Sequence, residues 1–136
     1  MNDEFYMRRA LELARRAQDE GEVPIGALVA LEGKVIGEGW NRPIAALDPT
    51  AHAEIQALRA AALSVKNYRL TGAMLYVTLE PFDMCAGAAF HARIARIVYG
   101  AKDPKKLVLK SQVELDGGVL AAECGSLLSA FFAAKR

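Results

Sequence analysis

The sequence lacks any long apolar run and carries almost no net charge. Hydrophobic residues make up 53% of the 136 residues, yet no uninterrupted stretch is long enough to cross a bilayer. The 17 basic and 16 acidic residues give a formal net charge of +1, which neither favours nor excludes a polyanionic partner. We therefore expect no membrane segment and one compact domain over residues 1–136, with a substantial hydrophobic core.

Cysteine is scarce as well. Cys85 and Cys124 are too few and too far apart in the sequence to form a disulfide framework. Residues 1–17 carry charges throughout and lack the apolar core of a secretory signal. Both features favour a cytoplasmic location.

The spacing of apolar residues alternates between the helical period and the strand period. An apolar residue recurs every three or four positions over residues 5–18, which predicts an amphipathic helix. Residues 73–79 are almost all apolar and predict a strand that is buried on both faces of a sheet. The other predicted elements are strands over 24–30 and 35–40 joined by a turn at 32–34, helices over 48–63, 80–94 and 118–134, and a strand over 95–101, while residues 107–115 fit a strand or a loop. This order implies an α/β fold, a three-layer α/β/α sandwich with a mixed sheet.

Two short segments place metal-ligating and proton-carrying side chains at expected helix starts. A helix start is predicted at Asp48, which puts His52 and Glu54 in the first turns of that helix. Cys85 follows the start of the next predicted helix, where backbone N–H groups and the helix dipole favour thiolate over thiol. If the two segments meet, His52 and Cys85 are candidate zinc ligands and Glu54 is a candidate proton carrier. Taken separately, each segment is common in sequences without such a role.

The combination of the two segments resembles the signature of a known family. HAE at residues 52–54 and EPFDMCAGA at residues 80–88 are similar to the H-x-E and P-C-x-x-C motifs of the zinc-dependent cytidine and nucleobase deaminases. EVPIGALVA, VIGEGWNRP, DPTAHAEIQALR, LYVTLEP and the closing VLAAEC are similar to the bacterial tRNA adenosine deaminases, so the resemblance covers nearly the whole chain. WNRP together with DPTAHAE separates the tRNA enzymes from most deaminases of free nucleosides.

The resemblance implies a fold of the cytidine deaminase type and hydrolytic deamination of adenosine to inosine at the wobble position of a tRNA anticodon. It implies a zinc ion, with His52 and Cys85 among the ligands, and Glu54 as the catalytic proton carrier. It also implies that the protein acts as a homodimer on the anticodon loop. The substrate-binding residues that it implies are Asn41, Ala53, Leu79, Asp103, Phe131 and Phe132.

Two departures from the family pattern bear on this activity. The first cysteine of the P-C-x-x-C motif is Phe82 here, and phenylalanine cannot ligate zinc. Asp83 is the nearest replacement, but one step along a helix turns a side chain by about 100°. The segment after Asp103 is shorter than its family counterpart. Two alternatives therefore stay open: a non-catalytic deaminase-like protein that binds RNA or a partner subunit, and a deaminase of free nucleosides or nucleobases.

Overall fold

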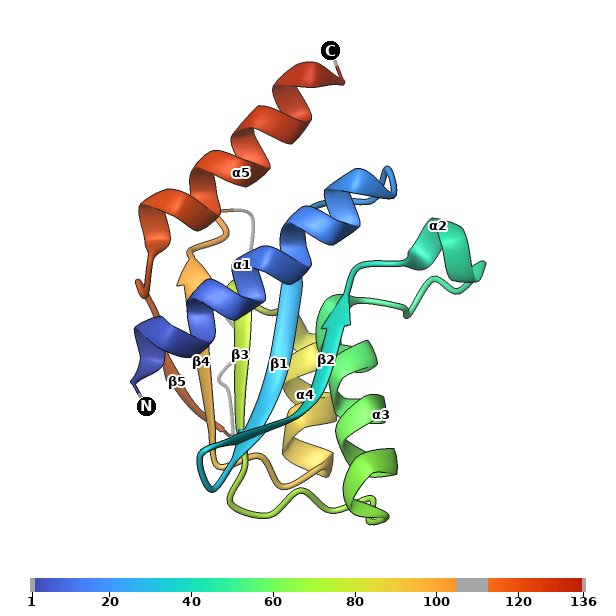
Figure 1. The fold of residues 1–136 in the computed structure, drawn as a ribbon, viewed down its shortest axis with the longest axis vertical. Helices are drawn as coiled ribbons and strands as arrows, with labels where there is room; N and C mark the ends of the chain where they lie inside the picture. The colour runs from blue at the N-terminus through green and yellow to red at the C-terminus, as the bar shows by residue number, and fades with distance from the viewer. Residues whose placement is uncertain (1, 105–112, 136) are drawn as a thin grey trace.

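The computed structural model describes residues 2–104 and 113–135, and this part of the chain forms one five-stranded sheet (Figure 1). β1 is antiparallel to both β2 and β3, whereas β3, β4 and β5 run parallel. The sheet is therefore mixed, as predicted. The strands are β1 (Gly26–Leu31), β2 (Lys34–Trp40), β3 (Met74–Leu79), β4 (Arg96–Ala101) and β5 (Glu114–Asp116), in the spatial order β2-β1-β3-β4-β5.

Helices cover both faces of the sheet. The sheet has one hydrophobic core on each face, and successive side chains of β1 point into opposite cores. Ala27 and Val29 pack on the α3 side, and Leu28 packs on the α1 side. The three-layer sandwich is thus confirmed. Within the described part of the chain, no helix combines the length and the apolar character needed to cross a bilayer. The helices are α1 (Asp3–Asp19) and α5 (Ala121–Ala134) on one face, α3 (Ala53–Val65) and α4 (Asp83–His91) on the other, and a short α2 (Pro43–Ala46) that projects from the body (Figure 1).

The β1–β2 hairpin holds α3 against the edge of the sheet. Its turn uses Glu32 and Gly33 with positive φ angles of 50° and 79°, the backbone that a two-residue hairpin turn requires. Gly37 and Gly39 of β2 lie so close to α3 that a Cβ atom at either position would overlap the backbone of Ala57. The first turn of α3 is therefore fixed directly beside the end of β2.

Two local features differ from the expectations from sequence. Asp48 does not begin α3, because its Oδ1 atom accepts hydrogen bonds from the backbone N–H (2.8 Å) and the hydroxyl (2.7 Å) of Thr50 and so closes a local turn. The helix begins five residues later, at Ala53. The sequence did not predict α2, since four residues are too few to show a helical period.

The stretch that fits a strand or a loop, residues 107–115, is described only in part. Its last two residues, Glu114 and Leu115, belong to β5, which pairs with β4. Residues 107–112 lie outside the described part of the chain. The strand alternative is therefore correct for the end of this stretch.

Candidate active site

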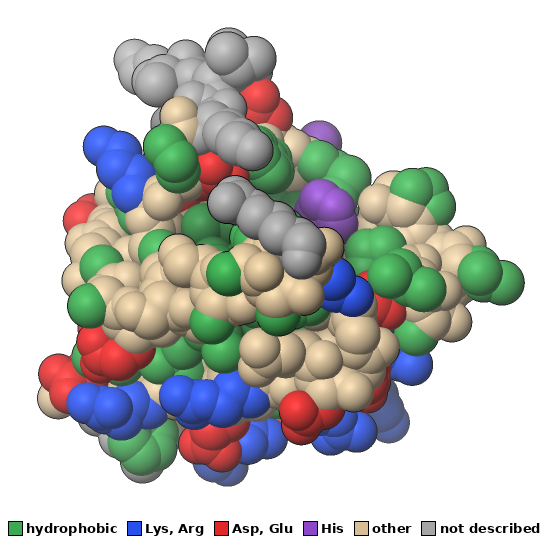
Figure 2. All heavy atoms as spheres, turned by 90° about the horizontal axis from the view of Figure 1, so that it is seen from above, with side chains coloured by type: hydrophobic (Ala, Val, Ile, Leu, Met, Phe, Trp, Pro, Cys, Tyr) green, Lys and Arg blue, Asp and Glu red, His purple; other side chains and the backbone are tan. Residues whose placement is uncertain are grey.

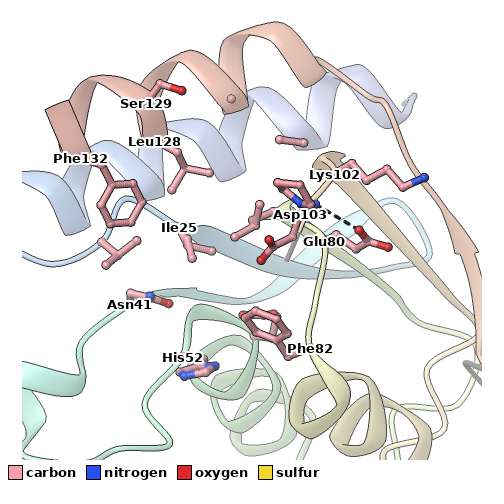
Figure 3. Close-up of a pocket in the computed structure, with 16 residues that line it drawn as sticks. Ile25, Asn41, His52, Glu80, Phe82, Lys102, Asp103, Leu128, Ser129 and Phe132 are labelled. Atoms are coloured by element: carbon pink, nitrogen blue, oxygen red, sulfur yellow. Dashed lines mark hydrogen bonds between the residues drawn. The ribbon is translucent and has the colours of Figure 1, made fainter. Parts of the chain in front are cut away.

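A pocket of about 520 Å³ opens where β3 and β4 end and where α3 and α4 begin (Figure 3). Because β3 and β4 are parallel, the residues that follow Leu79 and Ala101 meet at one edge of the sheet. α5 lies across the opposite side of the pocket (Figure 3). At this end of the molecule a histidine and hydrophobic side chains gather near the centre, while charged side chains follow one long edge (Figure 2). The lining includes the polar residues Asn41, His52, Glu54, Glu80, Lys102, Asp103 and Ser129 and the apolar residues Ile25, Leu79, Phe82, Leu128 and Phe132.

His52 lines this pocket and contacts Cys85, a buried residue that does not line it. The Nδ1 atom of His52 lies 3.5 Å from the Sγ atom of Cys85, although the two residues come from different segments. His52 is the residue directly before α3, and Cys85 lies in the first turn of α4. The two segments that the sequence singles out therefore do come together.

Glu54 is a buried carboxyl beside this pair. It lies in the first turn of α3, and burial raises its pKa to about 7, an effect that a hydrogen bond with Cys85 partly offsets. A carboxyl whose pKa lies near the working pH can both accept and return a proton at small cost. Glu54 lines the pocket with a pKa suited to proton transfer, and its role as the proton carrier stays a prediction.

Cys85 differs from the expectation of a ready thiolate. The side chain is fully buried, and burial together with the neighbouring charge of Glu54 raises the pKa of its thiol. These two effects oppose the preference of a helix start for thiolate. The role of Cys85 as a zinc ligand stays a prediction.

Asn41 ties the end of β2 to the start of α3. Its Oδ1 atom accepts a hydrogen bond of 2.8 Å from the backbone N–H of Ala53. This bond uses the amide oxygen, so the amide nitrogen is the group that can donate to a ligand in the pocket. Ala53 itself is buried and is not among the residues that line the pocket.

The residues of the pocket do not fit a three-ligand zinc site. Phe82 occupies the position of the third ligand, and its side chain has no atom that binds zinc. Across residues 2–104 and 113–135, no three His, Cys, Asp or Glu side chains are arranged to hold a metal ion. His52 and Cys85 are left as a pair, and Asp83 does not complete them.

Several pocket residues are visible only in the structure. Glu80 accepts a hydrogen bond of 3.1 Å from the backbone N–H of Asp103, which joins the loops after β3 and β4. A charged residue directly after a buried strand is a sequence feature that could have marked Glu80 as a pocket residue. No sequence feature marks Leu128 or Ser129 of α5. Of the two phenylalanines expected from the family, Phe132 lines the pocket, whereas Phe131 contacts the ring of Phe132 from outside that lining.

Comparison with protein families assigns a class to this architecture. Residues 1–101 match the family model of the cytidine and deoxycytidylate deaminase zinc-binding region. The matched range includes His52, Glu54 and Cys85. The fold and the site therefore define a domain of the deaminase class.

Individual relatives narrow this class. The chain is 49% identical to the tRNA-specific adenosine deaminase of Haemophilus influenzae over 98% of this chain and 85% of that enzyme. It is 41% identical to the tRNA-specific adenosine deaminase of Bacillus subtilis, over 96% and 88% of the two chains. A solved structure from a study of A-to-I editing by tRNA:A34 deaminases matches with a TM-score of 0.87 and 41% identity, and the match covers 91% of this chain and 99% of that one. The chain belongs to the family of tRNA-specific adenosine deaminases.

Proposed function

We propose that this chain binds the anticodon loop of a tRNA and converts the wobble adenosine to inosine, and that the missing third zinc ligand limits its turnover. The observation that carries the proposal is the placement of Glu54 and His52 together at the floor of one pocket. A volume of about 520 Å³ is within the range of pockets that hold one small ligand. The pocket can therefore receive a single nucleotide that has left its stack.

Glu54 is proposed to move the protons of this hydrolysis. The oxygen of water bonds to C6 of adenine while Glu54 takes the proton of that water and passes it to N1 of the ring. Glu54 then takes the proton of the new hydroxyl and passes it to the amino group, the C6–N6 bond breaks, and ammonia leaves. The described residues do not form a three-ligand zinc site. The attack of water on C6 therefore depends on Glu54 and is slow.

The wall formed by α5 supports RNA as the substrate. Leu128, Ser129 and Phe132 all face the pocket from this helix. Single-stranded loops present unpaired bases that proteins bind by stacking and by contacts to base edges. Membership of the tRNA-specific adenosine deaminases supports the anticodon loop in particular. We propose that the chain works as a single domain, as a homodimer and in the cytoplasm.

The proposal is tested by incubating the purified chain with an anticodon stem–loop that carries adenosine at the wobble position. Inosine is read as guanosine after reverse transcription, so its formation is measured at that one position. The control RNA carries adenosine elsewhere in the loop and guanosine at the wobble position. Inosine only in the first RNA supports the proposal, and equal deamination of free adenosine favours a deaminase of free nucleosides instead.

A second function is favoured by one observation. Phe82 at the ligand position fits a deaminase-like protein that binds RNA without turning it over. Retained binding of the stem–loop with no inosine after prolonged incubation, with or without added zinc, would select this second function. A zinc content of one ion per chain would count against it.

A further inference from the structure

We propose that Phe82 is a base-stacking residue and that the pocket holds the adenine ring without a metal ion. The inference rests on the proposed function, because it takes an adenosine to be the ligand of the pocket. It goes further in naming the group that binds the base and in making that binding independent of zinc.

The position of Phe82 is the first step. Phe82 directly precedes α4 in an extended conformation, with φ −77° and ψ 172°, and it lines the pocket. Phe82 is 45% exposed, whereas Cys85, three residues further on, is fully buried. The ring is therefore not part of the core. An apolar ring that is open at a pocket becomes buried only when a ligand covers it.

A second aromatic ring faces the pocket from the other side. Phe132 of α5 is 48% exposed and lines the same pocket, and Figure 3 shows it and Phe82 on opposite walls. Aromatic side chains hold bases through their π-faces, and this contact accepts any base because every base has such a face. Asn41 and His52 line the same pocket and can contact the edge of a base (Figure 3).

The chemistry of the site explains why stacking can replace metal binding there. A phenylalanine ring offers a π-face but no lone pair, so the substitution that removes a zinc ligand also adds a surface for a planar ring. Stacking on that surface needs neither a deprotonated thiol nor a third ligand. The affinity for the base should therefore not respond to zinc or to a chelator.

The experiment compares two anticodon stem–loops, one with adenosine at the wobble position and one that is abasic there. The ratio of their dissociation constants isolates what the base contributes. For the full chain dialysed against EDTA we expect the adenosine RNA to bind at least about fivefold more tightly, the lower end of what base stacking on one ring contributes. The ratio should stay the same when zinc is added.

Phe82→Leu is the test variant, because leucine keeps apolar bulk but has no π-face. We expect it to reduce the ratio to within about twofold of one, while Phe82→Tyr retains it. Phe90→Leu is the matched control: Phe90 lies on α4, the helix that Phe82 precedes, is 40% exposed and does not line the pocket. Thermal unfolding of each variant checks that the fold is kept.

Three outcomes overturn the inference. The ratio survives in Phe82→Leu, it rises there because the ring had blocked the pocket, or it appears in the parent only when zinc is present. If neither RNA binds, titration of free adenosine onto the parent and onto Phe82→Leu decides the same question. A chain that binds adenosine through Phe82 but makes no inosine keeps the inference and overturns the proposed activity, so the two failures are distinguishable.

Discussion

The Nδ1 atom of His52 lies 3.5 Å from the Sγ atom of Cys85, although 33 residues separate the two in the sequence. The contact exists because each residue stands at the start of a helix, and both helices pack on the same face of the sheet. The two residues predicted as zinc ligands are thus in contact. Phe82 stands where the family motif has its first cysteine, which makes this position the most informative one to change.

Phe82→Cys should convert the pair into a three-ligand site. We expect the zinc content to rise towards one ion per chain, because a third protein ligand strengthens zinc binding and closes the usual coordination of a catalytic site. Inosine formation in the stem–loop should increase by about tenfold or more. Elemental analysis after gel filtration and the inosine assay measure the two effects.

Phe82→Ala is the control for this experiment, since it removes the ring without adding a ligand. It should gain neither zinc nor turnover. An unchanged zinc content in Phe82→Cys would show that the backbone before α4 does not present residue 82 to His52 and Cys85. The idea that one side chain limits the site would then be wrong.

Glu54→Gln should abolish the chemistry and leave binding intact. Glutamine keeps the shape of the buried side chain but cannot exchange a proton, and general acid–base catalysis contributes about 10²–10⁴-fold to a rate. We expect a loss of at least about 100-fold in inosine formation in the Phe82→Cys background, with the affinity for the stem–loop unchanged. A variant that keeps turnover within about tenfold of its parent would remove Glu54 from the mechanism.

Long periodic elements and the segment around the site could be predicted from the sequence. The apolar run at residues 73–79 predicts a strand that is buried on both faces. In the structure Leu75 and Val77 pack in one core, and Tyr76 packs in the other. His52 and Cys85 could be paired only through a resemblance, because no local pattern states that two helix starts meet. Periodicity is a local signal, and the contact depends on the whole sheet.

Features held by single tertiary contacts could not be predicted. Asp48 has the composition of a helix cap, but its side chain bonds to Thr50 instead, and nothing in the sequence decides between the two. α2 depends on Glu22, a residue of a distant loop. A helix of four residues is too short to form an apolar stripe, so hydrophobic periodicity does not mark α2.

Glu22 should hold the loop that carries the pocket residues Asn41 and His52. It is only 2% exposed, and its carboxylate accepts hydrogen bonds from the backbone N–H groups of Ile44 (3.2 Å) and Ala45 (2.8 Å) at the start of α2. α2 itself buries none of its residues, and in Figure 2 the part that projects carries hydrophobic side chains. The carboxylate is therefore a main anchor of this segment.

Glu22→Ala should lower the free energy of unfolding by about 1–2 kcal/mol, the usual effect of losing a helix cap. It should also weaken binding of the stem–loop, because the residues that it positions line the pocket. Glu22→Gln, which keeps one acceptor oxygen, should restore most of the affinity. Urea unfolding and RNA titration measure the two effects, and an Ala variant with unchanged RNA affinity would show that the loop keeps its place without the cap.

The ion pair between Asp3 and Arg96 should make stability depend on pH in acid. Arg96 donates hydrogen bonds of 3.0 and 2.9 Å to the two carboxylate oxygens of Asp3, and Tyr76 donates one of 2.7 Å. The hydrogen bond from Arg96 lowers the pKa of Asp3 below its ordinary value of 3.8. A depressed pKa means that the carboxylate stabilises the fold above about pH 4, and that this contribution is lost as the pH falls further.

Asp3→Asn should therefore be less stable than the parent by about 1 kcal/mol at pH 6, and the difference should shrink towards pH 2. Unfolding in urea at several pH values measures it. Asp19→Asn, at the exposed end of the same helix, is the control and should follow the parent at every pH. A difference that does not change between pH 6 and pH 2 would show that the ion pair contributes nothing.

Binding of RNA should depend on salt through the lysines near the pocket. Lys102 follows β4 at the pocket, and Lys135 follows α5, whereas Lys105 and Lys106 lie outside the described residues. Each lysine that neutralises a phosphate releases counterions, so the affinity for a stem–loop should fall linearly with salt on a logarithmic plot. Replacing Lys102 and Lys135 by alanine should make this slope shallower by about 0.7 for each phosphate that is no longer neutralised.

The matched control pair is Lys34 and Lys66, at the β1–β2 turn and the end of α3, and their replacement should leave the slope unchanged. Binding that ignores salt, or an equal effect of both pairs, would contradict an RNA substrate held at this end of the sheet and would favour a free nucleoside.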